Sequence, residues 1–196
     1  MRNRARIRAA LLIAVSVQLA CDPKPNDPPE APWPSTPQCE GLDEWPVEWA
    51  ELERDALALV DAARDEGADC GVRGKLGHAP ALMRSPALHC AARFHALDMA
   101  EQGYFGRFDP DGVDERARVE AAGESPAWVT QHLASGPRDA QELVERTWLP
   151  RPIPCADLVS ETSTEVGLGH VGEVVDEDGN ETTLWVVVLA GPGEEP

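Results

Sequence analysis

Residues 88–112 read LHCAARFHALDMAEQGYFGRFDPDG, and this stretch is the most informative part of the chain. Its inward-facing positions recur at helical spacing and are Leu88, Ala91, Ala92, His95 and Met99. The spacing predicts an amphipathic helix that ends at Gly103, just before an aromatic pair. The Asp-Pro-Asp-Gly sequence at residues 109–112 then predicts a tight turn.

Residues 1–20 have the composition of an export leader. Arginines alternate through residues 1–8, and residues 9–20 form an apolar run that is too short to span a bilayer. The run ends in Gln-Leu-Ala-Cys, which approximates a lipobox and predicts lipidation of Cys21. The alternative is an ordinary secretory signal cleaved near Ala20, with Cys21 unmodified. Both readings predict an exported protein, either a lipoprotein of the cell envelope or an extracellular protein.

A change of composition divides the rest of the chain. Residues 21–46 carry eight prolines among polar side chains and have no apolar periodicity. Such a segment buries too little surface to fold, so we expect an extended, semi-rigid tether. We expect one folded domain over residues 47–192, a short acidic tail at residues 193–196, and a monomer.

The acidity of the chain limits its partners. The formal net charge is −18, and removal of the four leader arginines takes it to −22. Nucleic acids and anionic lipid head groups both bind cationic surfaces, so we expect neither as a ligand. We therefore expect membrane contact only through the lipid anchor, and we attribute the acidity to solubility.

The remaining patterns predict helices followed by strands. Residues 48–63, 113–122 and 137–148 carry apolar side chains at helical spacing. Residues 165–175 and 182–190 have strand patterns, and the Asp-Gly signal between them predicts a hairpin. Within the second strand a continuous apolar run predicts burial on both faces. This order predicts an α+β protein with a three-layer α-β-α sandwich.

Four cysteines remain if Cys21 is lipidated, and they are Cys39, Cys70, Cys90 and Cys155. An even number in an exported chain favours disulfides, but four cysteines allow three pairings and the sequence alone does not choose among them. A metal site is the rival interpretation. The chain has no Cys-x-x-Cys and no His-x-x-x-His spacing, so we expect no metal and no other cofactor.

The opening stretch resembles the core signature of the CAP superfamily (cysteine-rich secretory, antigen 5 and pathogenesis-related proteins). Bacterial members of that family read AAR.HS.DMA...FFSH..PDG, and residues 164–169, TEVGLG, are similar to the family's FTEVGVG strand. The matching positions of the signature are Ala91, Ala92, Arg93, His95, Asp98, Met99, Ala100, Phe105, Pro110, Asp111 and Gly112. The resemblance covers about residues 47–192 and implies the α-β-α sandwich of that family. It also implies the disulfides Cys70–Cys155 and, by consequence, Cys39–Cys90.

CAP domains usually gather two histidines and two acidic residues in a central cleft, which can bind a divalent metal. The resemblance places Arg107, Gln131, Arg151 and Pro154 at these four positions. Arginine stays protonated near neutral pH, glutamine has no titratable proton, and proline has no side-chain lone pair. The cleft implied by the resemblance therefore lacks its usual acids, bases and metal ligands.

Some polar residues near the implied cleft remain. The cleft candidates are His95, Arg107, Gln131, His132 and Arg151. We expect His95 to have a packing role, like the helix histidine of the family. We also expect Asp98 to be a buried hydrogen-bond acceptor and the glycines of residues 164–169 to allow close packing of the hairpin.

No motif in the sequence predicts catalysis. The chain has no Gly-x-Ser-x-Gly and no Ser-His-Asp or Cys-His arrangement. We therefore expect a non-enzymatic binding module with a lipid, a glycan or a protein as its ligand. The alternative is a metal-binding or hydrolase-like CAP protein with an unorthodox site, for which the remaining candidates are His95, His132, Asp157 and Glu165.

Overall fold

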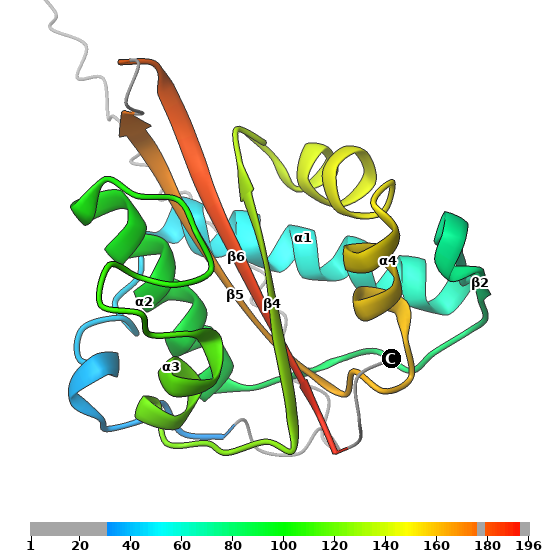
Figure 1. Cartoon of the computed structure of the whole chain (residues 1–196), viewed down its shortest axis with the longest axis horizontal. Coiled ribbons are helices and arrows are strands. Elements are labelled where there is room, and N and C mark those ends of the chain that lie inside the picture. The colour runs from blue at the N-terminus through cyan, green and yellow to red at the C-terminus, as the bar shows by residue number, and fades with distance from the viewer. Residues whose placement is uncertain (1–30, 176–178, 193–196) are drawn as a thin grey trace, which may run out of the picture. The chain divides into compact units, whose positions relative to one another are not determined.

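The structure is a computed structural model, and it describes residues 31–175 and 179–192 (Figure 1). The chain divides into a unit at residues 1–30 and a larger unit that begins at Ala31, and the description below concerns the larger unit. The leader, the lipidation of Cys21 and the acidic tail were predicted for segments outside the described residues, so they stay predictions.

A four-stranded sheet with the order β3-β5-β6-β4 forms the middle of the domain. Its strands are β3 (Met83–Arg84), β4 (Trp128–Ser135), β5 (Glu165–Val175) and β6 (Glu181–Gly191). The β5–β6 pair is antiparallel, which confirms the predicted hairpin strands. Strand β6 lies between β5 and β4 and is buried from Leu184 onward, because helices cover both faces of the sheet. A separate two-stranded sheet joins β1 (Ala68–Asp69) to β2 (Lys75–Leu76).

Helix α2 (Pro86–Gln102) confirms the helix predicted from the opening stretch. Ser85 caps it by accepting a hydrogen bond from the Leu88 amide, and Pro86 occupies the first turn, where no amide partner is needed. Gly103 ends the helix with a left-handed φ of 69°, and its amide donates to the Met99 carbonyl. The turn after it also forms, since the Gly112 amide donates to the Asp109 carbonyl.

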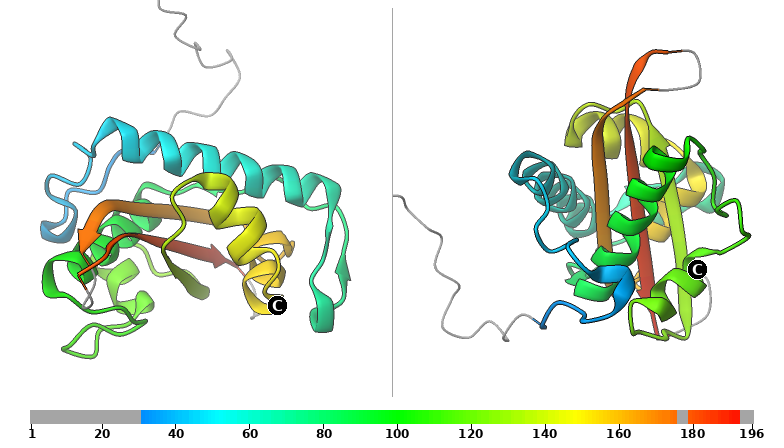
Figure 2. Two further views of the ribbon diagram at one scale, coloured as in Figure 1. Left: turned by 90° about the horizontal axis from the view of Figure 1, so that it is seen from above. Right: turned by 90° about the vertical axis from the view of Figure 1, so that its left-hand side faces the viewer.

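Helices lie on both faces of the sheet and complete the three layers (Figure 2). One face carries α2, α3 (Glu115–Ala121) and the short helix η1 (Pro37–Cys39), around a core that includes Leu88, Met99 and Val186. The other face carries α1 (Val47–Glu66), η3 (Glu142–Trp148) and α4 (Pro152–Val159), around Trp148, Leu158 and Trp185. The predicted α-β-α sandwich is confirmed.

Two elements differ from the helix and strand patterns of the sequence. Residues 137–148 were predicted as a regular α-helix, but η3 has π-helical geometry, in which the wider turn directs Leu143, Val144 and Trp148 into the core together. Helix α4, which contains Pro152 and Pro154, was not predicted from the sequence. Proline is tolerated there because both lie in the first turn, where amides have no intrahelical partner.

Strand β4 was not predicted from the sequence, in which Gln131 and His132 were only cleft candidates. Its polar residues Thr130, Gln131 and His132 hide the alternation of apolar residues that predicts a strand. They fit the strand because two of them hydrogen-bond to side chains on opposite faces of the sheet, as described below. The pairing runs from Trp128 opposite Gly191 to Ser135 opposite Leu184.

Glycines in β5 bring α2 unusually close to the sheet. A Cβ atom on Gly167 would lie 2.0 Å from the Leu88 carbonyl carbon, and one on Gly169 would lie 2.5 Å from that of Ala92. The expected packing role of these glycines is therefore confirmed, and the element packed against them is α2.

The segment at residues 31–46 belongs to the folded domain, so the predicted tether is wrong for this part of residues 21–46. Cys39 and Leu42 are buried, and the Trp33 indole donates to the Cys39 carbonyl at 3.0 Å. The Arg93 guanidinium lies 5.5 Å and 5.1 Å from the ring centroids of Trp33 and Trp45. The segment is polar and rich in proline on average, but these few large side chains bury enough surface for it to fold.

Disulfides Cys39–Cys90 and Cys70–Cys155 join the segments in the pairing that the family resemblance implied. The first ties η1 to α2, and the second ties the loop after α1 to α4. Among the described residues, no helix is long and apolar enough to cross a membrane.

Candidate functional site

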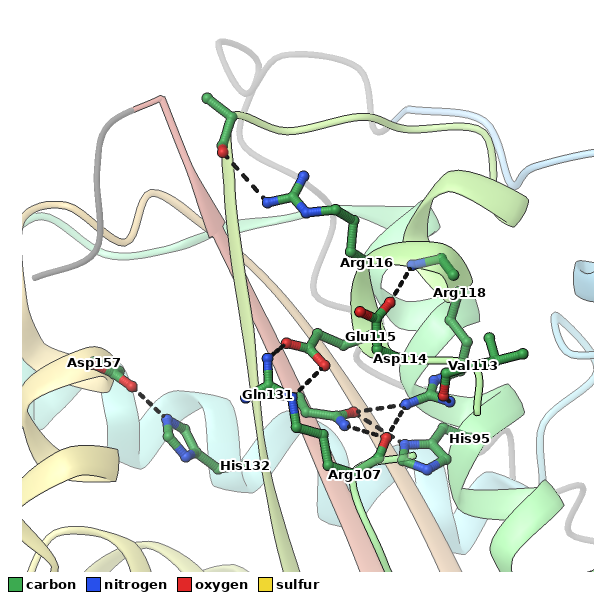
Figure 3. A network of polar contacts seen from close by, with 12 residues as sticks. His95, Arg107, Val113, Asp114, Glu115, Arg116, Arg118, Gln131, His132 and Asp157 are labelled. Atoms are coloured by element: carbon green, nitrogen blue, oxygen red, sulfur yellow. Dashed lines mark hydrogen bonds and ion pairs between the residues drawn. The ribbon is translucent and has the colours of Figure 1, made fainter. Parts of the chain in front are cut away.

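Two neighbouring residues of β4 divide the candidate residues between the two faces of the sheet. Side chains alternate along a strand, so Gln131 points toward α2 and His132 points toward α4. Figure 3 shows the two side chains on opposite sides of the strand. The candidates predicted for one cleft therefore lie in separate places.

On the α2 side, His95 and Gln131 form a buried hydrogen bond. The His95 Nδ1 atom lies 3.0 Å from the Gln131 side-chain oxygen, and this oxygen accepts, so Nδ1 carries the proton. Burial, helped by the nearby positive charge of Arg118, lowers the pKa of His95 from 6.5 to about 4. His95 is thus a neutral imidazole near pH 7, and its Nε2 atom has no hydrogen-bond partner among the described residues.

The backbone carbonyl of Arg107 accepts two hydrogen bonds at the centre of this network. The Gln131 amide donates to it at 2.9 Å and the Arg118 guanidinium at 2.6 Å. The Arg107 side chain leaves the network and forms an ion pair with Glu115, whose carboxylate is almost completely buried. We name this group, with His95, Gln131 and Arg118, the α2-side network.

Arg118 and Glu115 were not predicted as site residues. Both belong to α3, which the sequence predicted only as a short helix over residues 113–122. Burial depends on the loop that packs over the helix, and Arg118 donates to carbonyls of that loop at Val113 and Arg107. The spacing of apolar residues within α3 does not indicate that this loop covers the helix.

On the α4 side, His132 pairs with Asp157. The His132 Nε2 atom lies 2.8 Å from one carboxylate oxygen, and both side chains are almost entirely shielded from solvent. The other carboxylate oxygen of Asp157 is buried and has no hydrogen-bond partner among the described residues. This pair shares no hydrogen bond with the α2-side network.

Arg151 and Pro154, the other two positions implied by the family resemblance, lie at the start of α4. The Arg151 side chain is exposed and makes no hydrogen bond or ion pair with the described part of the chain. Glu165, a further candidate, is the first residue of β5 and lies far from both histidines in the sequence. Burial raises the pKa of its carboxyl group. Neither arginine nor proline at these positions supplies a metal ligand.

A cavity of about 230 Å³ opens beside the α2-side network. It lies between the C-terminal end of α2 and the far ends of β5 and β6, and its lining is mostly apolar. The lining includes Met99, Gly103, Tyr104, Phe105, Val174 and Leu184. Tyr104 joins the cavity to the site, because its ring centroid lies 6.1 Å from that of His95 and its hydroxyl donates to Asp98 at 2.6 Å.

Asp98 is a hydrogen-bond acceptor, as predicted, although it is only half-buried. The cavity itself was not predicted. The aromatic pair after Gly103 marks one wall of it, but the other wall comes from strands that lie about seventy residues later in the sequence. Across residues 31–175 and 179–192, no three His, Cys, Asp or Glu side chains gather in a group that could hold a metal ion.

Comparison with known proteins identifies the family. The model of the CAP family, described as the cysteine-rich secretory protein family, matches residues 57–189. Among curated proteins there is no significant match.

Solved structures share the fold. An outer surface protein from Borrelia burgdorferi has 18% identity and a TM-score of 0.55, over 72% of this chain and 92% of its own. An extracellular SCP-domain protein from Bacillus anthracis has 14% identity and a TM-score of 0.55, over 73% of this chain and 41% of its own. A cysteine-rich secretory protein from Staphylococcus aureus has 16% identity and a TM-score of 0.52, over 74% and 40%. The family match covers most of the chain and agrees with the observed sandwich, so this protein belongs to the CAP family.

Proposed function

We propose that this CAP domain is a non-enzymatic binding module and that its ligand occupies the cavity between α2 and the β5–β6 hairpin. The single observation that carries the proposal is this apolar cavity, next to a network whose charged and polar groups already bind one another. Binding pockets typically combine an apolar lining with a few polar groups at the edge. Here the hydroxyls of Ser135 and Thr182, 3.0 Å apart, supply that polar edge.

The state of the candidate acids and bases supports a function without catalysis. A general base must be within reach of a substrate and must exchange its proton near the working pH. His95 is fully buried, and burial keeps its pKa at about 4. The four cysteines at positions 39, 70, 90 and 155 are all in disulfides and offer no thiolate.

The dimensions of the cavity favour a small apolar group. At about 230 Å³ the cavity is larger than the roughly 150 Å³ that accommodates benzene and smaller than the roughly 300 Å³ of a typical drug-sized site. A segment of an acyl chain or a fused aromatic ring system fits this range. The high negative charge of the chain disfavours an anionic head group, so the ligand is neutral or cationic.

Binding of N-phenyl-1-naphthylamine, a neutral apolar fluorescent probe, tests the proposal. We expect a saturable rise in fluorescence that Ala100→Trp abolishes, because Ala100 lines the cavity and the indole fills it. Ala121→Trp, on the exposed surface of α3, is the matched control and should bind normally. Equal probe binding by both variants would show that the cavity is not the site.

A metal-dependent or hydrolase-like function is the alternative, and the buried His132–Asp157 pair favours it. Zinc requires three or four ligands, whereas this pair supplies two. We expect titration calorimetry of chelator-treated protein with zinc to give no saturable heat. A one-to-one site of micromolar or tighter affinity that His132→Ala abolishes would establish the alternative.

We further propose that the mature protein is exported and anchored through Cys21. Two disulfides are typical of oxidising compartments outside the cytoplasm, and the matched bacterial structures are described as outer surface or extracellular proteins. Cys21→Ala should move the protein from the detergent phase to the aqueous phase, or block its processing. Unchanged partitioning would show that Cys21 carries no lipid anchor, and export alone would remain proposed.

A further inference from the structure

The end of the domain that is distant from the cavity carries a compact projection made of two short segments. Helix η2 (Gly71–Arg73) and the first turn of α4 lie side by side at one end of the sandwich, as the left view of Figure 2 shows. The Cys70–Cys155 disulfide joins them, and a Cβ atom on Gly71 would lie 3.8 Å from the Pro152 ring. The disulfide holds both segments in a fixed relation.

Large apolar side chains on this projection are exposed to solvent. Val72 is 93% exposed, and Ile153, on the neighbouring turn, is 54% exposed. Single exposed apolar residues are common on protein surfaces and have no significance alone. Here two of them share one disulfide-linked end, next to a group of cations.

The cations are unusual in so acidic a chain. Arg73 follows Val72 directly in the sequence, Arg151 precedes Ile153 by two residues, and Lys75 begins β2. All three cations are exposed. The Lys75 ammonium lies 3.9 Å from the Asp69 carboxylate, which offsets part of its charge. The guanidinium groups of Arg73 and Arg151 form no ion pair with the described residues. We name these three cations, together with Val72 and Ile153, the basic tip.

We propose that the basic tip docks on the surface of an anionic phospholipid bilayer. Aliphatic side chains on a cationic surface can enter the head-group region while the cations remain among the lipid phosphates. The net charge, −18 for the whole chain and −22 without the four leader arginines, opposes the approach at long range, but at physiological salt this repulsion is screened beyond about 8 Å. The local charge of the basic tip then decides the contact. This proposal differs from our expectation that only a lipid anchor meets the membrane, and it does not depend on the proposed cavity ligand.

The form of the basic tip favours a membrane over an acidic protein. Apolar anchors of protein interfaces enter preformed pockets and are surrounded by matched contacts. Val72 instead projects from a three-residue helix and is almost fully exposed, so its neighbours on this chain form no rim of contacts around it. A fluid lipid surface adapts to such a projection without a complementary pocket.

Co-sedimentation with vesicles tests the proposal. The protein carries Cys21→Ser, so that no acyl chain contributes, and mass spectrometry confirms that the leader has been removed. We expect binding to phosphatidylglycerol vesicles and none to phosphatidylcholine vesicles. Arg73→Gln with Arg151→Gln should weaken binding about twenty-five-fold, since each cation near an anionic surface contributes a factor of about five. Val72→Ser with Ile153→Ser should weaken it by about tenfold.

A matched control separates the basic tip from the net charge. Arg54→Gln with Arg138→Gln removes two exposed cations elsewhere in the domain and makes the same change in net charge. This control should bind phosphatidylglycerol vesicles as the unsubstituted protein does, and all variants should keep the same unfolding temperature.

Two results would overturn the proposal. One is equal loss of vesicle binding in the control and in the basic-tip variants, which would make the effect one of net charge. The other is binding to soluble polyglutamate, dependent on Arg73 and Arg151, without binding to phosphatidylglycerol vesicles. That second result would assign the basic tip to an acidic protein partner.

Discussion

The two faces of the β-sheet each contain a buried arginine whose guanidinium binds backbone carbonyls, but the two arginines hold different kinds of structure. On the α1 side, Arg64 donates at 2.6–2.9 Å to the carbonyls of Pro80, Leu158, Ser160 and Ser163. On the α2 side, Arg118 binds the loop at Arg107 and Val113.

We call the α1 side the closed face, because its segments enclose the core, and the α2 side the open face, because the apolar cavity lies there. Arg64 joins chain segments that are far apart in the sequence, and they enclose the core beneath α1 and α4. Arg118 holds a local loop that leads to the exposed Phe105 and Phe108, and the apolar cavity opens on the same side. The closed side has a structural role, and the binding function that we propose belongs to the open side. Four predictions test this division.

Loss of Arg64 should destabilise the domain more than loss of Arg118. Arg64→Met leaves four carbonyls without their donor, and the three buried ones cost about 1–3 kcal/mol each, so we expect a loss on the order of 5 kcal/mol. Arg118→Met should cost about 3 kcal/mol, since fewer carbonyls lose a donor. Urea unfolding of both variants measures the difference. Equal losses would contradict the division into a closed and an open face.

The two disulfides, one on each side of the sheet, should raise the free energy of unfolding of the domain by similar amounts. The bridges close loops with sequence separations of 51 and 85 residues, for which the chain-entropy model gives about 4 kcal/mol in each case. The pairs Cys39→Ser with Cys90→Ser, and Cys70→Ser with Cys155→Ser, test this in urea. Peptide mapping without reduction should first recover both native links. A Cys70–Cys90 link would refute the pairing.

A methyl group between α2 and the sheet should destabilise the open face. Gly169→Ala places a Cβ atom 2.5 Å from the backbone of α2, which must shift, so we expect a loss of about 3 kcal/mol. Gly77→Ala is the control, because a Cβ atom there meets no atom within 4 Å. If both variants unfold at the same urea concentration, the contact between α2 and β5 is looser than described.

Acid should destabilise both faces through buried neutral histidines. Burial lowers the pKa of His95 on the α2 side, and of His170 on the α1 side, from 6.5 to about 4. Between these values each of the two imidazoles binds more protons in the unfolded chain than in the folded protein. The stability that each histidine contributes is therefore complete above pH 6.5 and is lost as the pH falls toward 4.

Substitution of either histidine should reduce this pH dependence. Each contributes about 2 kcal/mol of the stability lost by about pH 5. His95→Gln and His170→Gln should thus each flatten the plot of unfolding free energy against pH by about that amount. An unchanged slope in His95→Gln would show that His95 does not become protonated on unfolding in this range.

Local features of the sequence were sufficient to predict several elements. The apolar spacing before Gly103 predicted α2, and the run in residues 184–189 predicted a strand covered on both faces. These predictions were correct because helix caps, turns and periodic burial depend on residues within a few positions of one another. The resemblance to the CAP family supplied the disulfide pairing, which spacing had left open.

Other features depend on contacts between distant segments, so no local pattern predicted them. Strand β4 is polar because Gln131 and His132 meet partners from different helices. The residues at 31–46 fold because Cys39 and Trp33 contact helix α2, through the disulfide with Cys90 and the ring contact with Arg93.

The sequence by itself determined the helix at α2, the final hairpin and the family, because each is written in neighbouring residues. Only the tertiary structure decided that Gln131 and His132 serve opposite faces and that Arg118 is buried. It also brought Gly71 against Pro152 and opened a cavity between α2 and the hairpin. The physical reason is that burial, pairing and enclosure belong to surfaces that several chain segments make together.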